Sequence, residues 1–122
     1  MKNKKQKPLL KQKWNKHFVF YHNKGTLHFV LGVAKRGDYV AGHELTTHPS
    51  LNKNGKPKKK YILLQKNPNP GDVRNSYADK HLRKNIRVHF QDTWEKRLVI
   101  RKKWKLSKKD KKYIKKLDKK KI

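Results

Sequence analysis

The side chains of this sequence that could do chemistry are histidines, threonines, lysines and arginines. The chain has seven histidines and 36 lysines and arginines, against eight acidic residues that form no cluster. Two-metal nucleases hold their cations with grouped carboxylates, so the pattern argues against a metal-dependent nuclease and predicts no metal site. Neither the phosphate-binding Gly-x-x-x-x-Gly-Lys loop nor the Gly-x-Ser-x-Gly motif of serine hydrolases occurs. We therefore expect no cofactor.

The same residue types fit a metal-independent cleavage of RNA. In that reaction the 2′-hydroxyl attacks its own phosphate, which requires a base near neutral pH, an acid for the leaving oxygen and cations around the phosphate. Histidine suits the proton transfers, because its unperturbed pKa is about 6.5. Arginine, lysine and threonine suit the phosphate.

A formal net charge of +28 on 122 residues indicates a polyanionic partner, because such a charge repels itself in the compact state. Nucleic acid fits best, since each neutralised phosphate releases counterions and adds affinity that does not depend on sequence. The basic segments lack the aromatic anchors of membrane-surface helices. We therefore expect RNA, or DNA, as the partner and no membrane.

The cysteine count and the N-terminus bear on the compartment. The chain has no cysteine, so disulfide frameworks and thiolate zinc sites are ruled out. The basic residues 1–7 are not followed by the apolar stretch of a signal peptide. We therefore expect a cytoplasmic protein.

The order of the elements predicts an α+β fold, a small antiparallel curled sheet or barrel with two basic surface helices. Aromatic and β-branched runs separated by glycine turns predict antiparallel strands. These strands cover residues 17–22, 27–34, 39–45, 60–65 and 97–104. Capping signatures at Ser76 and Ser107 predict one helix over residues 76–90 and a second that begins after residue 107.

Three segments follow from this pattern. Residues 1–16 are predicted to be a flexible basic arm, 17–104 a single β-rich nucleic-acid-binding domain, and 105–122 a Lys-rich C-terminal helix or tail. Basic residues of the turns, of the long loop after residue 46 and of the helix over 76–90 are the candidates for phosphate contacts. They are Lys24, Lys56, Lys58, Lys59, Lys60, Arg83, Lys84 and Arg87.

Two runs carry a resemblance to a known family. Residues 25–33, Gly-Thr-Leu-His-Phe-Val-Leu-Gly-Val, and 39–47, Tyr-Val-Ala-Gly-His-Glu-Leu-Thr-Thr, resemble the core of PemK/MazF-like ribonuclease toxins. The segment 38–49 is also similar to a stretch of the type III toxins, which an RNA neutralises. No Arg-Pro pair of the family pattern occurs in this chain, and the 67–72 loop has no counterpart that we can place.

The resemblance implies an SH3-like barrel and a metal-independent endoribonuclease that cuts single-stranded RNA. It places His28 where the family has its catalytic arginine, and Thr46 or Thr47 where the family has its threonine. His48, in the loop beside them, is the second candidate for proton transfer. The resemblance also implies a neutralising partner, either an acidic antitoxin protein or an antitoxin RNA.

Each candidate also has a structural interpretation. His28 lies opposite the apolar face of its strand and can simply face solvent. Thr46 and Thr47 can be strand-end residues that bond their own backbone. His43 shares a face with apolar residues, so we predict a structural role for it. A second function stays open: a non-catalytic RNA- or DNA-binding protein, such as a ribosome-associated or mobile-element factor, accounts for the charge without catalysis.

Overall fold

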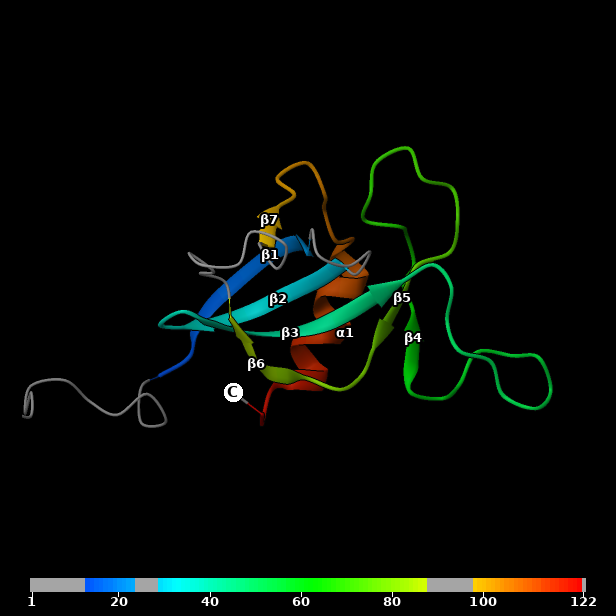
Figure 1. Cartoon of the computed structure of the whole chain (residues 1–122), viewed down its shortest axis with the longest axis horizontal. Coiled ribbons are helices and arrows are strands. Elements are labelled where there is room, and N and C mark those ends of the chain that lie inside the picture. Colours follow the sequence, from blue (N-terminus) through cyan, green and yellow to red (C-terminus); the bar gives the residue numbers. More distant parts are fainter. Residues whose placement is uncertain (1–12, 24–28, 88–97, 122) are drawn as a thin grey trace, which may run out of the picture.

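The computed structural model describes residues 13–23, 29–87 and 98–121 of the chain. A curled antiparallel sheet crosses the molecule and one helix covers one of its faces (Figure 1). The strands are β1 Asn15–Asn23, β2 Phe29–Arg36, β3 Tyr39–Thr46, β4 Tyr61–Leu63, β5 Tyr77–Asp79, β6 Arg83–Arg87 and β7 Leu98–Ile100, and the helix is α1 Lys108–Asp118. The strand order is β4-β5-β3-β2-β1-β7, and β6 also pairs with β3.

The three longest strands form a meander at the centre of the sheet. β1 pairs with β2 and β2 with β3, both antiparallel, as the short glycine turns predict. Arg36 pairs with Tyr39, so the hairpin loop has two residues, and Gly37 takes a φ of 60° that favours glycine. A register shift in β2 between Gly32 and Ala34 is a bulge, which bends a strand and increases its twist.

Apolar side chains of β2 and β3 face two cores. One core contains Leu31, Ala41 and, from α1, Ile114, each with 0% of its surface exposed. The second core lies on the other face and contains Val40 and Ile86. Both faces of β2 and β3 are therefore buried, whereas the sequence predicted one apolar face for the second strand.

The prediction of a helix over residues 76–90 is wrong for residues 76–87, the part that the structure describes, because this part contains the strands β5 and β6. Both strands run along the same edge of β3, where Leu45 pairs with Ala78 and Val40 with Ile86. The apolar spacing that predicted a helix also fits this interrupted strand. The open edge of β3 supplies backbone partners, and the second core receives Ile86. Residues 88–90 lie outside the described part of the chain.

The C-terminal helix agrees with its predicted start. The Ser107 side chain accepts a hydrogen bond of 3.1 Å from the backbone N–H of Asp110, which is the expected N-cap. The α+β class is thus confirmed, but the described residues hold one helix rather than two, and the sheet is not closed, since β4 and β7 do not pair. β1 begins at Asn15, within the segment predicted as an arm, and residues 1–12 lie outside the described part.

Two buried acids attach α1 to the rest of the fold, Asp110 to the segment after β4 and Asp118 to β3. Both carboxylate oxygens of Asp110 accept from the backbone N–H of Gln65, at 3.0 and 2.9 Å. Nε2 of His43 lies 2.7 Å from Oδ2 of Asp118, and its Nδ1 lies 2.7 Å from the carbonyl oxygen of Asp79. His43 is 0% exposed, which confirms its structural role. Within the described ranges, no helix is long and apolar enough to span a membrane.

Candidate functional site

A cleft of about 410 Å3 lies at the C-terminal end of β3. The end of β3, the loop between β4 and β5, the start of β2 and the segment before α1 supply its walls. The lining residues are Phe29, Leu45, Thr46, Thr47, His48, Asn67, Asn69, Asp72, Arg74, Ser76 and Trp104. The cleft therefore combines hydroxyls, an imidazole, a guanidinium and aromatic rings.

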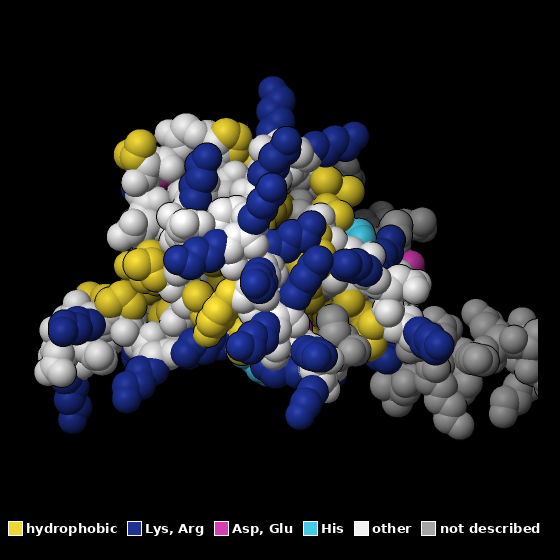
Figure 2. Space-filling model, turned by 180° about the vertical axis from the view of Figure 1, so that it is seen from behind, with side chains coloured by type: hydrophobic (Ala, Val, Ile, Leu, Met, Phe, Trp, Pro, Cys, Tyr) yellow, Lys and Arg dark blue, Asp and Glu magenta, His cyan; other side chains and the backbone are white. Residues whose placement is uncertain are grey.

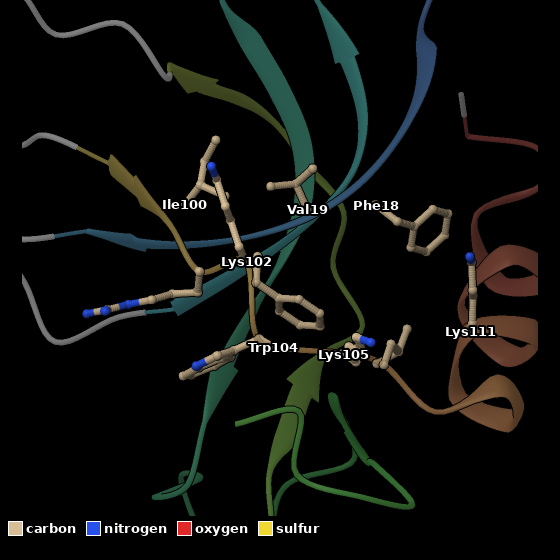
Figure 3. A pocket seen from close by; sticks show the side chains of 10 residues that line it. Phe18, Val19, Ile100, Lys102, Trp104, Lys105 and Lys111 are labelled. Atoms are coloured by element: carbon tan, nitrogen blue, oxygen red, sulfur yellow. The ribbon is translucent and has the colours of Figure 1, made fainter. Parts of the chain in front are cut away.

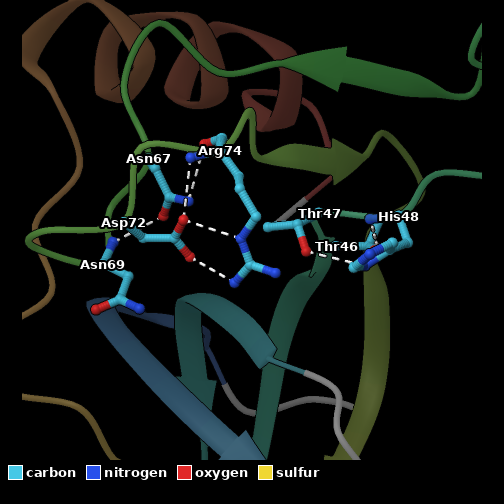
Figure 4. A network of polar contacts seen from close by, with 7 residues as sticks. All are labelled: Thr46, Thr47, His48, Asn67, Asn69, Asp72 and Arg74. Atoms are coloured by element: carbon cyan, nitrogen blue, oxygen red, sulfur yellow. Dashed lines mark hydrogen bonds and ion pairs between the residues drawn. The ribbon is translucent and has the colours of Figure 1, made fainter.

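Three consecutive candidates from the sequence form one side of the cleft. The backbone N–H of His48 donates to Oγ1 of Thr46 at 2.9 Å, and Oγ1 of Thr47 lies 3.1 Å from Nδ1 of His48 (Figure 4). The first bond closes a tight turn at the strand end, as threonines often do. It brings two hydroxyls and an exposed imidazole to the same place.

Arg74 faces them from the other side of the cleft. Its Nε and Nη2 donate to the two carboxylate oxygens of Asp72, at 3.0 and 2.7 Å. These hydrogen bonds, with a third from the Arg74 backbone N–H, lower the pKa of Asp72 to about 2 and raise the pKa of Arg74. A guanidinium has five N–H donors, so the hydrogens that Asp72 does not use are available to an anion. Figure 4 shows the guanidinium between Asp72 and Thr47.

The loop that carries Arg74 is held by its own side chains. Oδ1 of Asn67 accepts from the backbone N–H of Asn69 at 2.9 Å, and its Nδ2 donates to the carbonyl of Arg74 at 3.1 Å. Gly71 takes a φ of 84°, which a residue with a side chain rarely adopts. Residues 67–72 therefore form a loop, as the sequence indicates, and this loop places Arg74 in the cleft.

Aromatic rings form the third wall. Phe29 and Trp104 stack with centroids 4.4 Å apart and planes at 23°, and His22 stacks on Phe29 at 4.4 Å and 15°. Arg101 donates from Nη2 to Nδ1 of His22 at 2.9 Å. Partly exposed rings beside cations are suitable surfaces for unpaired bases.

The other predicted residues lie elsewhere. His28 and Lys24 fall outside the described residues. Lys56, Lys58 and Lys59 are exposed on the loop between β3 and β4, which projects from the end of β3 (Figure 1). They do not line the cleft.

The last four basic candidates also lie outside the cleft, Lys60 immediately before β4 and the other three on β6, which pairs with β3. Lys60 is 3.6 Å from Asp79, and Arg83 is 3.5 Å from Glu44. Lys84 is exposed on β6, and Arg87 ends that strand. Arg83, Lys84 and Arg87 therefore sit on a strand and not on the predicted helix.

Sequence reasoning missed Arg74, Asp72 and Trp104. The sequence indicates only a loop over residues 67–72 and places Trp104 at the end of the predicted strand 97–104. The spacing Asp72-x-Arg74 at a turn is the one local signal, because an acid two residues before an arginine can orient its guanidinium. Nothing local brings Trp104 to this cleft.

Neither a metal-binding cluster nor a similar protein helps to assign this site. Among the residues that the structure describes, no three histidine or acidic side chains come together in a way that could hold a metal ion. No protein-family model, curated protein or solved structure matches the chain.

Proposed function

We propose that the chain is a metal-independent endoribonuclease that cuts single-stranded RNA in the cleft at the end of β3. The observation that carries this proposal is the meeting of Thr46, Thr47, His48 and Arg74 around one cleft. The resemblance to PemK/MazF-like toxins supports it, since that resemblance assigns catalysis to Thr46 or Thr47.

The proposed reaction is an internal transfer of the phosphate ester. The 2′-oxygen forms a bond to phosphorus while the bond from phosphorus to the 5′-oxygen breaks, which leaves a 2′,3′-cyclic phosphate and a 5′-hydroxyl. One group takes the proton of the 2′-hydroxyl and another protonates the 5′-oxygen. His48 performs one of these transfers, and His28 remains the predicted partner for the other.

The remaining groups bind the phosphate. Arg74 donates to its non-bridging oxygens, where negative charge develops in the transition state, and Asp72 keeps the guanidinium in position. The hydroxyls of Thr46 and Thr47 donate to the same phosphate or its neighbour. The exposed loop lysines Lys56, Lys58 and Lys59 add affinity for the backbone of the RNA.

The test is an incubation of nucleic-acid-free protein with end-labelled RNA in EDTA. We expect fragments that end in cyclic phosphate. Thr47→Val, His48→Ala and Arg74→Ala should each slow cleavage by about 100-fold or more. The matched control His81→Ala removes an exposed histidine outside the cleft and should retain activity. Uncut RNA in a salt-sensitive complex would refute the proposal.

That outcome would support the second candidate, a non-catalytic RNA- or DNA-binding protein. The exposure of Lys56, Lys58 and Lys59 on a projecting loop favours it, because these residues can contact phosphates without any chemistry. A DNA of the same sequence separates the two functions. It lacks the 2′-hydroxyl, so a ribonuclease cannot cut it, whereas a phosphate-binding protein retains affinity for it.

A ribonuclease of this kind would cut the RNA of its own cell unless an inhibitor bound it. We propose a neutralising partner that is either an acidic protein or a structured RNA, and a cytoplasmic location without membrane attachment. The net charge of +28 suits both kinds of partner. Co-expression that restores growth would identify the partner, and an RNase-resistant complex would indicate a protein.

A further inference from the structure

A second hollow lies between β1, the segment of residues 100–106 and α1. It has a volume of about 440 Å3, and the rings of Phe18, Phe20 and Trp104 line it together with three lysines, Lys102, Lys105 and Lys111. Figure 3 shows Phe18, Trp104 and these lysines around the hollow. An adjoining hollow of about 270 Å3 shares Phe18 and extends to Trp14. We call the two hollows together the β1–α1 groove. Lysine and arginine side chains dominate the face of the molecule shown in Figure 2.

The floor of the β1–α1 groove alternates rings with cations. Nζ of Lys111 lies 5.1 Å and Nζ of Lys115 lies 5.6 Å from the centroid of the Phe18 ring. The guanidinium of Arg36 lies 4.3 Å from the Trp14 ring. A single strand of nucleic acid presents the complementary pattern, with a flat base and a phosphate in every nucleotide.

Like charges also gather in this groove. Lys16 lies close to Lys115 and lowers the pKa of its ammonium group, because a neighbouring positive charge disfavours a second one. Asp118 is the acid in the groove lining, and its Oδ2 is already bonded to His43. A phosphate between the two ammonium groups would relieve their repulsion.

Trp104 connects the groove to the cleft. Its ring stacks on Phe29 in the cleft and tilts against Phe20 in the groove, with centroids 5.8 Å apart. Trp104 lines both hollows. An RNA strand that leaves the cleft past this ring therefore enters the groove.

We propose that the β1–α1 groove binds the single-stranded RNA that flanks the cut site. Phe18 and Trp104 stack on its bases, and Lys111 and Lys115 contact its phosphates. The inference rests on the proposed function, because it takes the cleft as the place of cleavage. A duplex is a poor fit, since its bases already stack on one another and offer no free face to these rings.

The test measures binding apart from cleavage. A labelled 2′-O-methyl RNA has no free 2′-hydroxyl, so its binding can be followed by fluorescence anisotropy whether or not the protein is a ribonuclease. Lys111→Gln/Lys115→Gln removes the groove pair. Lys112→Gln/Lys116→Gln removes the same charge at the same spacing on exposed positions of α1 outside the groove lining.

We expect the groove pair to weaken binding about tenfold and to lower the salt slope by about 1.4, for two phosphate contacts on a single strand. The matched pair should weaken binding less than about threefold. Phe18→Leu retains an apolar floor and should weaken binding about fivefold or more through lost stacking, with the thermal transition used to confirm folding. A duplex of equal length should bind more weakly than the single strand.

The proposal of RNA binding in the groove would be refuted if the two lysine double variants weakened binding equally, or if duplex and single strand bound equally well. Failure of the two proposals can be told apart. If the groove variant weakens binding but natural RNA stays uncut, the ribonuclease proposal is refuted and the groove proposal is supported. If RNA is cut but the two lysine double variants bind equally well, the ribonuclease proposal is supported and the groove proposal is refuted.

Discussion

Replacing Asp118 with alanine removes one half of the buried pair that attaches α1 to the sheet. Asp118 is 3% exposed and its Oδ2 lies 2.7 Å from Nε2 of His43, which is 0% exposed. The Asp79 carbonyl can only accept, so Nδ1 of His43 carries the hydrogen of that 2.7 Å contact. Alanine leaves Nε2 buried with no partner at this position.

The expected cost is large relative to the stability of a small domain. Removal of one partner of a buried ion pair costs about 3–5 kcal/mol, and the whole free energy of unfolding is about 5–15 kcal/mol. The melting temperature should fall by at least about 10 °C. Asp118→Asn keeps a group that can hydrogen-bond Nε2, so it should cost less, about 1–3 kcal/mol.

Urea unfolding followed by circular dichroism and tryptophan fluorescence measures these changes. Lys112→Ala, on an exposed position of the same helix, is the control and should change the free energy of unfolding by less than about 0.5 kcal/mol. The double variant His43→Leu/Asp118→Leu removes both polar partners and should be more stable than Asp118→Ala. If Asp118→Ala lies within about 1 kcal/mol of the wild type, the pair does not hold α1 as described.

Three further predictions concern the cleft, the sheet and pH. Asp72→Asn should slow RNA cleavage about tenfold or more through misplacement of Arg74, and the ratio to wild type should stay constant from about pH 5 to 8, because the pKa of Asp72 is about 2. Gly42→Ala should destabilise the protein by about 1–3 kcal/mol in urea unfolding, since its Cβ would lie 2.7 Å from a backbone carbonyl oxygen of β2. Burial, with a smaller contribution from a nearby lysine charge, lowers the pKa of His17 from 6.5. The unfolded state therefore binds the proton more readily, and stability falls as pH drops below that value. His17→Gln should show a smaller fall in urea midpoint between about pH 7.5 and 5.5; an equal fall would contradict this assignment.

Local signals were sufficient for the hairpins and for α1. Gly37 has the backbone freedom that the two-residue turn requires, and Ser107 caps the helix through its own side chain. Both depend on residues within a few positions of each other, so a sequence shows them directly. The same holds for Thr46, Thr47 and His48, which are neighbours in the chain and remain neighbours in the cleft.

Non-local pairing decided the region over residues 76–90. Leu82 and Ile86 have the spacing of the apolar face of a helix, and no pattern within that segment predicts the strands β5 and β6. The deciding partner is β3, whose edge begins more than 30 residues earlier at Tyr39. Backbone groups on that edge need partners, and the strands that supply them outweigh a weak local helix signal.

The sequence by itself determined the charge, the antiparallel class of the sheet and the Thr46–His48 half of the cleft. Only the tertiary structure decided the other half, because Arg74 and Trp104 reach the cleft from two separate loops. It also decided the role of His43, since Asp79 and Asp118 lie 36 and 75 residues away in the chain. Hydrogen bonds and stacking act over a few ångströms, so they depend on which distant segments the folded chain brings together.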